Sequence, residues 1–293
     1  LYQLPPVVSS LERDIFKTHY PSPYFFSAKA FHDIELKHVE LKTVYRQKDN
    51  AFLTLLNRVR NNTVSPLDLA RLNTRLNAEA SDNDDFYITL TTTNKKADEI
   101  NEEHLGALEG DTFCSKAVIS GNFGKEYYPT SQELNFKMNS QIMLLNNDPK
   151  KRWVNGSIGI IKSVQEDEKG DSYLQVYLPE RKKVVNITPF GWELFKFSLE
   201  GTTIVSEPIG TFTQYPFRLA WAVTIHKSQG KTFDKVVIDM GRGAFAAGQT
   251  YVALSRCTSF EGVVLKSPIK KHDIKTDPRI QAFMSHFEED LSS

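Results

Sequence analysis

The segment TIHKSQGKTFDKVVID, residues 224–239, gathers hydrogen-bonding side chains directly before a short apolar run. These side chains all precede Gly230 and are Thr224, His226, Lys227, Ser228 and Gln229. A linker with a purely structural role rarely holds so many, since each polar group buried without a partner costs about 1–3 kcal/mol. Lysine pairs with phosphate, the hydroxyls bond backbone oxygens, and histidine stacks on a base or bonds a phosphate. The composition favours contact with a polyanion, and an ordinary capped turn is the alternative.

A second segment, GQTYVALSRCTS, residues 248–259, combines apolar side chains with one arginine. The apolar residues predict a helix through Tyr251–Arg256, with Arg256 held rigidly at its C-terminal end. A planar guanidinium fixed in this way can stabilise the charge on a transferring phosphoryl group. A cation that complements the helix dipole is a commoner arrangement. The spacing alone therefore leaves both interpretations open.

Elements that alternate between strand and helix must position these two segments. Asp49 is well placed as the N-cap of a helix whose buried face carries Phe52, Leu55, Leu56 and Val59. The run Tyr87–Leu90 predicts a strand, and a helical stripe follows it, comprising Ala97, Ile100, Leu105 and Leu108. Strand followed by helix indicates an α/β fold.

The character of the chain changes between residues 140 and 214. Apolar runs separated by Asn, Asp, Gly and Pro predict a small all-β insert, with strands at 142–145, 158–164, 173–178 and 184–187. The α/β pattern resumes after Phe217, with strands at 236–238 and 263–265. A closing helix is predicted to pack on the α/β domain through Ile280, Phe283, Met284 and Phe287.

Composition limits the classes of function. The 293 residues include 36 Lys+Arg and 36 Asp+Glu, so any contact with nucleic acid must be local rather than the work of bulk charge. Cys114 and Cys257 have no partners at metal-ligand spacing, which argues against a disulfide framework or a metal site. No apolar run approaches the roughly 18 residues of a membrane span. We expect a soluble, intracellular protein, and Leu1 in place of Met suggests a chain that starts inside a larger protein.

The two polar segments stand in the order and spacing of motifs five and six of superfamily-one helicases. Together, HKSQG and YVALSR resemble the Pif family closely and the RecD-like helicases more distantly. Three other stretches agree with this resemblance. LYQLPPV resembles the end of motif three, VYRQKD resembles motif four, and TTTNKKADEIN resembles a strand-to-helix segment that touches single-stranded DNA. The resemblance covers essentially the whole chain.

The resemblance implies a role for particular residues. Gln3 matches a glutamine that senses the γ-phosphate, and Arg46 and Arg256 match arginines that contact it. The positions implied to lie at the nucleotide are Gln229, Gly230, Lys231 and Tyr251. The positions implied to contact DNA are Thr92, Asn94, Lys95, Thr224, His226, Lys227 and Ser228. Alternatives stay open, because Arg46 can pair with Asp49, and Asn94 and Lys95 can cap and solvate a helix.

The fold implied by the resemblance is the second RecA-like motor domain, interrupted by an SH3-like β-barrel. Residues 1–37 would be the end of a first RecA-like domain, 38–139 with 217–293 the second, and 140–216 the barrel. The chain contains no G-x-x-x-x-G-K-[ST] phosphate loop and no strand ending in an acidic pair for magnesium. We therefore expect ATP and Mg²⁺ to be held mainly by a first domain outside this chain, and the chain alone to be inactive.

The function implied is that of an ATP-dependent 5′-to-3′ DNA helicase, acting as a monomer on single-stranded DNA, forked duplexes and G-quadruplexes. The rival hypothesis is a non-catalytic nucleic-acid-binding module, in which the β-barrel tracks a backbone and the α/β part is a scaffold.

Overall fold

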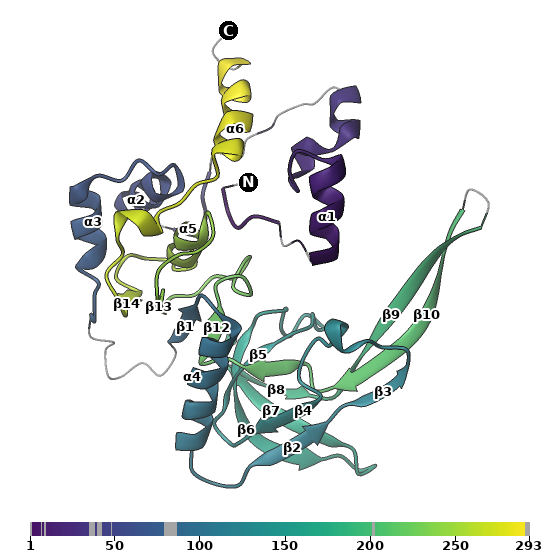
Figure 1. Ribbon diagram of the computed structural model, residues 1–293. Coiled ribbons are helices and arrows are strands. Elements are labelled where there is room, and N and C mark those ends of the chain that lie inside the picture. Colours follow the sequence, from purple (N-terminus) through teal and green to yellow (C-terminus); the bar gives the residue numbers. More distant parts are fainter. Residues whose placement is uncertain are drawn as a thin grey trace. The chain divides into compact units, whose positions relative to one another are not determined.

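The computed structural model describes the chain except residues 1, 7, 9, 35–38, 40–42, 48, 79–86, 201–202 and 291–293. The chain forms two compact units. The first combines Leu1–Asn94 with Val223–Ser293, and the second is Lys95–Ala222 (Figure 1). None of the helices within the described ranges is long and apolar enough to cross a membrane.

The first unit is built around a parallel sheet with strand order β12-β1-β13-β14. These strands are β1 (Ile88–Thr91), β12 (Ala222–Thr224), β13 (Val236–Asp239) and β14 (Val263–Leu265). β13 pairs in parallel with β1 on one side and with β14 on the other, with Val236 opposite both Ile88 and Val263. β-branched residues fill the strands because both faces of such a sheet are covered. The predicted strands at 87–90, 236–238 and 263–265 are confirmed.

Helices make up much of the rest of the first unit. They are α1 (Ser10–His19), α2 (Asn50–Arg60), α3 (Pro66–Asn73), α5 (Gln249–Leu254) and α6 (Pro278–Asp290), with 3-10 turns η1 (Phe25–Ser27), η2 (Lys29–Asp33) and η5 (Lys271–Asp273). The expected N-cap of α2 is confirmed, because the Asp49 carboxylate accepts a hydrogen bond from Ala51 N at 2.8 Å. Its predicted apolar face is also buried. α2 is thus fixed at its start and along one side.

The closing helix α6 packs through the residues expected of it, as far as its side chains are described. Ile280 is buried, and the Phe283 ring stacks on Phe26 at 4.4 Å and meets Phe25 edge-on. Met284 is partly buried, and the side chain of Phe287 lies outside the described residues. This aromatic contact joins η1 to α6 within the first unit.

The second unit is mainly antiparallel β-structure, preceded by helix α4 (Asn94–Ala107). One sheet has the order β11-β5-β6-β7-β8, another β3-β10-β9, and a two-stranded sheet pairs β2 with β4. The strands are β2 (Phe113–Lys116), β3 (Val118–Gly121), β4 (Glu133–Phe136), β5 (Gln141–Leu144), β6 (Ile158–Glu166), β7 (Ser172–Leu178), β8 (Lys183–Ile187), β9 (Phe190–Glu200), β10 (Thr203–Gln214) and β11 (Phe217–Leu219), with 3-10 turns η3 (Lys125–Tyr127) and η4 (Pro179–Arg181). The four predicted strands correspond to β5–β8.

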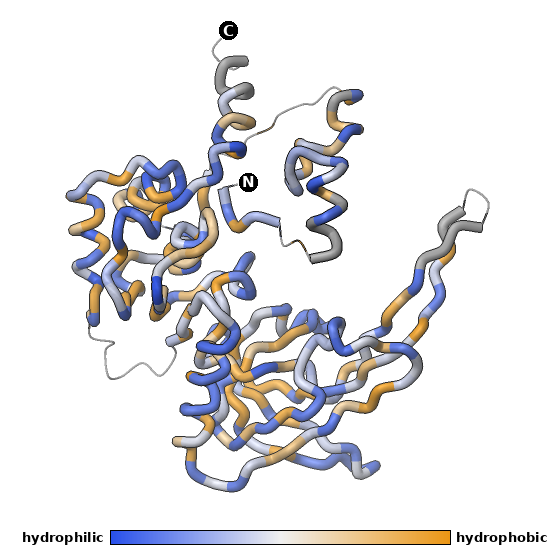
Figure 2. Tube along the Cα trace, in the orientation of Figure 1, coloured by the Kyte–Doolittle hydropathy of each residue, from blue (hydrophilic) through white to orange (hydrophobic). Residues whose placement is uncertain are grey.

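One apolar core joins strands on both sides of the predicted insert boundary. Leu134 and Phe136 of β4 are buried with Ile142, Ile161 and Phe217. Figure 2 shows hydrophobic residues concentrated along the strands of this unit. The β-structure therefore begins about Phe113 rather than at residue 140, because β2 and β4 contribute to the same core. The SH3-like architecture and the domain boundaries remain predictions.

Candidate functional site

Helix α5 lies two residues earlier in the chain than predicted, and Arg256 lies beyond its end. The helix runs from Gln249 to Leu254, and Ser255 is its C-cap. The predicted range of 251–256 is thus corrected at both ends. The physical reason is that Arg256 Nε donates to the Val252 carbonyl at 2.9 Å, which satisfies one of the carbonyls left without a partner at a helix end.

Arg256 is almost completely buried, with 1% of its surface exposed. Its guanidinium also donates to the Lys231 carbonyl at 3.3 Å and to Ser255 Oγ at 2.9 Å. Burial, together with the neighbouring charge of Arg46, lowers the pKa of Arg256 to about 10. The expected rigid placement is confirmed by these contacts.

Arg46 comes from the loop before α2 and meets the same end of α5. Its Nη1 donates to the Ser255 carbonyl at 3.0 Å, and its Nε donates to Thr232 Oγ1 at 3.0 Å. Burial lowers the pKa of Arg46 as well. Both guanidinium groups therefore contact Ser255, one through its carbonyl and the other through its hydroxyl.

Gln47 fixes this loop and was not singled out in the sequence. Its side chain is buried, and Nε2 donates to the carbonyls of Ser255 at 3.1 Å and Cys257 at 2.9 Å. The sequence does not show whether a polar residue such as Gln47 is buried, so only the structure reveals its contacts. Gln47 holds the backbone beside Arg46 against the end of α5.

The two arginines lack an anionic partner among the described residues. Neither guanidinium forms an ion pair there with a carboxylate, and the expected alternative pairing of Arg46 with Asp49 is not formed. The electrostatic interaction with the neighbouring Tyr251 raises the pKa of both arginines. Burying two like charges together is costly unless an opposite charge joins them. The arginine pair therefore fits an anionic ligand.

The glutamines expected at the nucleotide lie together at a loop of the same unit. Gln229 Nε2 donates to Gln3 Oε1 at 3.3 Å. The Gln3 backbone packs so closely on Gly248 that a Cβ there would collide with the Gln3 carbonyl. Gly230 has a φ of 76°, which favours glycine, and Lys231 is half-buried with its pKa lowered by burial. Gln3, Gln229 and α5 thus share one neighbourhood.

The loop after β12 is joined to the end of β1. The Ile225 amide donates to the Thr91 carbonyl at 2.9 Å, one residue before Thr92. Asn94 and Lys95 begin α4 and are exposed. Within the first unit, the predicted DNA-contacting segments around Thr92 and His226 therefore lie side by side.

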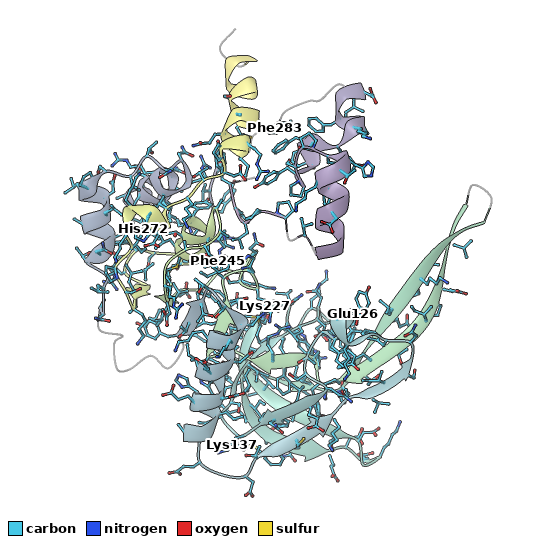
Figure 3. All side chains as sticks on the ribbon, viewed as in Figure 1. Glu126, Lys137, Lys227, Phe245, His272 and Phe283 are labelled. Carbon is cyan, nitrogen blue, oxygen red and sulfur yellow. The ribbon has the colours of Figure 1, made fainter. Side chains whose placement is uncertain are left out.

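Two of the predicted DNA contacts are turned inward. Ser228 is fully buried, and its hydroxyl donates to the Ile225 carbonyl at 2.7 Å. Thr224 is buried, and its hydroxyl lies 3.4 Å from the Lys227 amide that donates to it. The structure does not support the contact expected of Ser228, because the turn uses its hydroxyl. His226 is half-buried, and Lys227 is exposed (Figure 3).

The similarity of this chain to known proteins covers almost all of it. The ATP-dependent DNA helicase Pif1 of Campylobacter jejuni is 30% identical over 271 residues, covering 88% of this chain, and human PIF1 is 30% identical over 96% of it. Unliganded Pif1 from Bacteroides matches 98% of the chain with a TM-score of 0.81 and 33% identity. The chain belongs to the Pif1 helicase family. No protein-family model matches it.

This chain spans only part of the Pif1 proteins that it matches. It covers 59% of the Campylobacter relative, 41% of human PIF1 and 66% of the Bacteroides structure. A further Bacteroides Pif1 structure, described as a complex with ADP-AlF3 and ssDNA, matches 99% of this chain with a TM-score of 0.76 and 33% identity. The Pif1 resemblance expected from the two helicase motifs is therefore confirmed.

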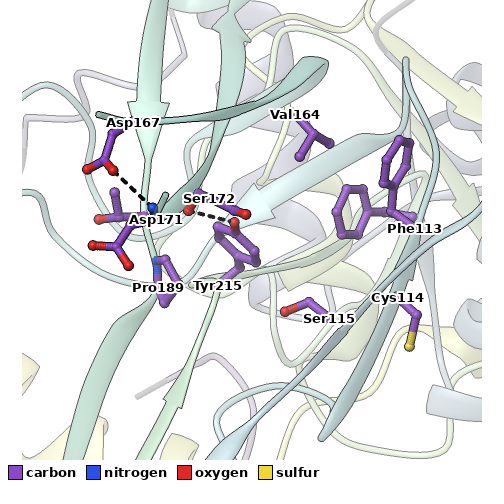
Figure 4. A pocket seen from close by; sticks show the side chains of 11 residues that line it. Phe113, Cys114, Ser115, Val164, Asp167, Asp171, Ser172, Pro189 and Tyr215 are labelled. Carbon is purple, nitrogen blue, oxygen red and sulfur yellow. Dashed lines mark hydrogen bonds between the residues drawn. The ribbon is translucent and has the colours of Figure 1, made fainter. Parts of the chain in front are cut away.

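A cavity of about 550 Å³ lies apart from the predicted site residues of this Pif1 homologue (Figure 4). It belongs to the second unit, and its walls include Phe113, Tyr215 and the acidic turn residues Asp167 and Asp171. Tyr215 Oη donates across it to the Ser172 carbonyl at 2.9 Å. The carboxylates of Asp167 and Asp171 in its lining do not favour an anionic phosphate there.

Proposed function

We propose that this chain is the C-terminal motor part of an ATP-dependent DNA helicase that moves 5′-to-3′ on single-stranded DNA. In this proposal, a preceding RecA-like domain holds the phosphates and Mg²⁺, and the first unit of this chain closes on the nucleotide. Forked duplexes and G-quadruplexes are the proposed substrates, and the helicase acts as a monomer. The family supports this proposal, since its curated relatives are ATP-dependent DNA helicases.

One observation carries the proposal, namely the pair of guanidinium groups at the end of α5 without a carboxylate partner among the described residues. A terminal phosphate supplies the missing negative charge. Arg46 is less buried than Arg256 and reaches the phosphate directly, while Arg256 adds positive potential from a fixed position. Arginines used in this way are worth about 10³–10⁵ in rate in other phosphoryl-transfer enzymes.

The same neighbourhood supports coupling to DNA. Gln3 and Gln229 contact one another, and Gln229 belongs to the loop that carries His226 and Lys227. A change in the position of the terminal phosphate at the arginine pair is passed through this loop to the strand. Repeated binding and hydrolysis then moves the motor along DNA.

The test is DNA-stimulated ATP hydrolysis by the full-length protein with Arg46→Ala. We expect turnover to fall by about 10³-fold or more, while affinity for single-stranded DNA changes little. Arg71→Ala is the matched control, because Arg71 lies in the same unit and packs over the Phe260 ring. Wild-type turnover in Arg46→Ala would reject the proposed role of the pair. A parent that binds DNA without hydrolysing ATP would instead establish the rival binding module.

Arg256→Ala requires a folding control, because the side chain is buried. Thermal unfolding of this variant separates loss of turnover from loss of structure. Arg256→Lys keeps the charge but loses the planar fork, so we expect it to fold and to remain strongly impaired.

A further inference from the structure

Phe245 is an exposed aromatic residue in the loop between β13 and α5. Its surface is 60% exposed, although the residues on either side are better covered. A single exposed apolar residue is ordinary on a protein surface. Its surroundings distinguish it, because hydrogen bonds hold the backbone of its loop and the ring of His226 lies nearby.

The backbone on both sides of Phe245 is held by side chains of the first unit. The Phe245 amide donates to Gln249 Oε1 at 3.0 Å, and Gln249 is fully buried. The Ala244 amide donates to Asp273 Oδ1 at 3.1 Å, and Lys275 Nζ donates to the Ala244 carbonyl at 2.6 Å. An exposed ring on such a fixed backbone loses little entropy when a flat ligand settles on it.

His226 lies beside Phe245 in nearly parallel orientation. The two ring centroids are 6.4 Å apart and the planes differ by 19°. This separation is too long for full overlap of the two rings, so most of the Phe245 face stays uncovered. Burial lowers the pKa of His226, which keeps the imidazole neutral at pH 7 and suits it to stacking rather than to pairing with phosphate. Two rings from different loops thus present parallel faces next to the exposed Lys227.

We propose that Phe245 is a stacking platform for an unpaired nucleobase of the bound strand, with the His226 ring alongside it. The inference rests on the proposed function and adds a residue that the helicase motifs do not include. Stacking reads no sequence, because every base has an aromatic face. The platform therefore grips the strand through its bases, while nearby lysines engage its phosphates.

The experiment measures binding of the full-length protein to a short oligothymidine. We expect Phe245→Ala to raise the dissociation constant about 5- to 150-fold. A base–aromatic stack is worth about 1–3 kcal/mol, and about 1.4 kcal/mol corresponds to a tenfold change in the dissociation constant. Phe245→Trp retains binding, and Phe245→Leu falls between the two. Phe195→Ala is the matched control, an exposed phenylalanine of the second unit. The slope of affinity against salt stays the same in Phe245→Ala, because no phosphate contact is lost.

A second measurement reports stacking itself. An oligonucleotide carrying 2-aminopurine loses fluorescence where its base stacks, so a scan of this base along the strand finds the quenched position in wild type. That quenching must disappear in Phe245→Ala and persist in Phe195→Ala.

The outcomes separate the inference from the function on which it rests. Unchanged affinity and unchanged quenching in Phe245→Ala, with wild type binding DNA, overturn the platform and leave the helicase proposal standing. A loss of ATP turnover or of thermal stability without weaker DNA binding also overturns it, since Phe245 would then serve contact between domains. A wild-type protein that binds no single-stranded DNA overturns both.

Discussion

At the scale of single residues, Arg46 and Arg256 carry positive charges that no carboxylate of the described residues neutralises. Arg256 is buried against backbone carbonyls, and Arg46 lowers its pKa instead of raising it. Elsewhere the chain pairs such groups, as in Arg152, which donates from Nε and Nη2 to Asp148 at 2.9 and 2.8 Å. Arg152 is therefore neutralised within the chain, whereas no carboxylate of the described residues pairs with Arg46 or Arg256.

Inorganic sulfate should stabilise the chain through the arginine pair. A divalent anion offsets the repulsion between Arg46 and Arg256, so we expect a higher midpoint of thermal unfolding in sulfate than in chloride at equal ionic strength. Sulfate also stabilises proteins in general. The increase in the unfolding midpoint of Arg46→Ala measures this general effect. An identical gain in Arg46→Ala and wild type would show that the pair binds no anion.

Asp148→Asn should destabilise the second unit by about 1–3 kcal/mol, because its buried carboxylate accepts charge-assisted hydrogen bonds. We expect the loss of stability to lie near the lower end of this range, because Arg152 is partly exposed to solvent. Hydrogen bonds from Arg152 hold the pKa of Asp148 at about 2, below its ordinary 3.8. The stabilisation is therefore present above pH 3.8 and lost as pH falls from 3.8 towards 2. Urea unfolding of both proteins at pH 7 and pH 2.5 tests this, and an equal difference at both values would refute it.

At the scale of elements, the start of α5 joins the parts of the site. The loop that presents Phe245 ends at Gly248, α5 begins at Gln249, and the guanidinium of Arg256 bonds the end of α5. Gly248 has a φ of 72° and packs on the backbone of Gln3. One short helix therefore connects Phe245, Gln3 and the arginine pair.

Gly248→Ala should disturb this junction. An alanine there adopts a left-handed conformation at a cost of about 1–2 kcal/mol, and its Cβ displaces the carbonyl of Gln3. We expect lower thermal stability and, in the full-length protein, lower ATP turnover. Gly106→Ala in α4 is the control, because nothing lies within 4 Å of its added Cβ and a helical alanine stabilises. Equal stabilities of the two variants would contradict the account.

The sequence predicted elements whose apolar periodicity was undisturbed. Phe52, Leu55, Leu56 and Val59 formed the buried face of α2, and β5–β8 followed their apolar runs. β9 and β10 were missed. In β10, Pro208 and Gly210 resemble breaks in the sequence, and the structure accommodates them as a shift in the register between those residues.

The motifs drew attention to Arg46, Arg256, Gln3 and Gln229, and their roles at a nucleotide stay predictions. Gln47 and Gln249 were not singled out, because the sequence does not show that these polar side chains are buried. Ser228 was assigned to DNA because a hydroxyl in a motif looks the same whether it faces outward or into its own turn.

At the scale of the whole molecule, the balanced charge makes any grip on nucleic acid local. With 36 basic and 36 acidic residues, the chain has no excess positive charge to hold DNA at a distance. The proposed contacts are a few cations and one aromatic platform. Affinity should therefore depend on individual residues.

Each lysine that contacts a phosphate should change the salt dependence of DNA binding by a defined amount when it is replaced. Each phosphate contact of a single strand contributes about −0.7 to the slope of log K against log salt. We expect Lys227→Ala to reduce that slope by about 0.7, and the exposed Lys182→Ala, at the turn after η4, to leave it unchanged. Filter binding or fluorescence anisotropy across a salt series measures both. An unchanged slope in Lys227→Ala would remove this residue from the contact.

We propose that Arg46 and Arg256 act on the phosphoryl group during transfer, and affinity for a mimic of that state measures this role. In the full-length protein with Mg²⁺ and DNA, binding of ADP with aluminium fluoride should be compared with binding of ADP alone for wild type and Arg46→Ala. We expect Arg46→Ala to lose about 10³-fold in affinity for the mimic and little for ADP, because only the mimic carries the group that the pair stabilises. Equal effects on both ligands, or none on either, would show that Arg46 does not act on this group.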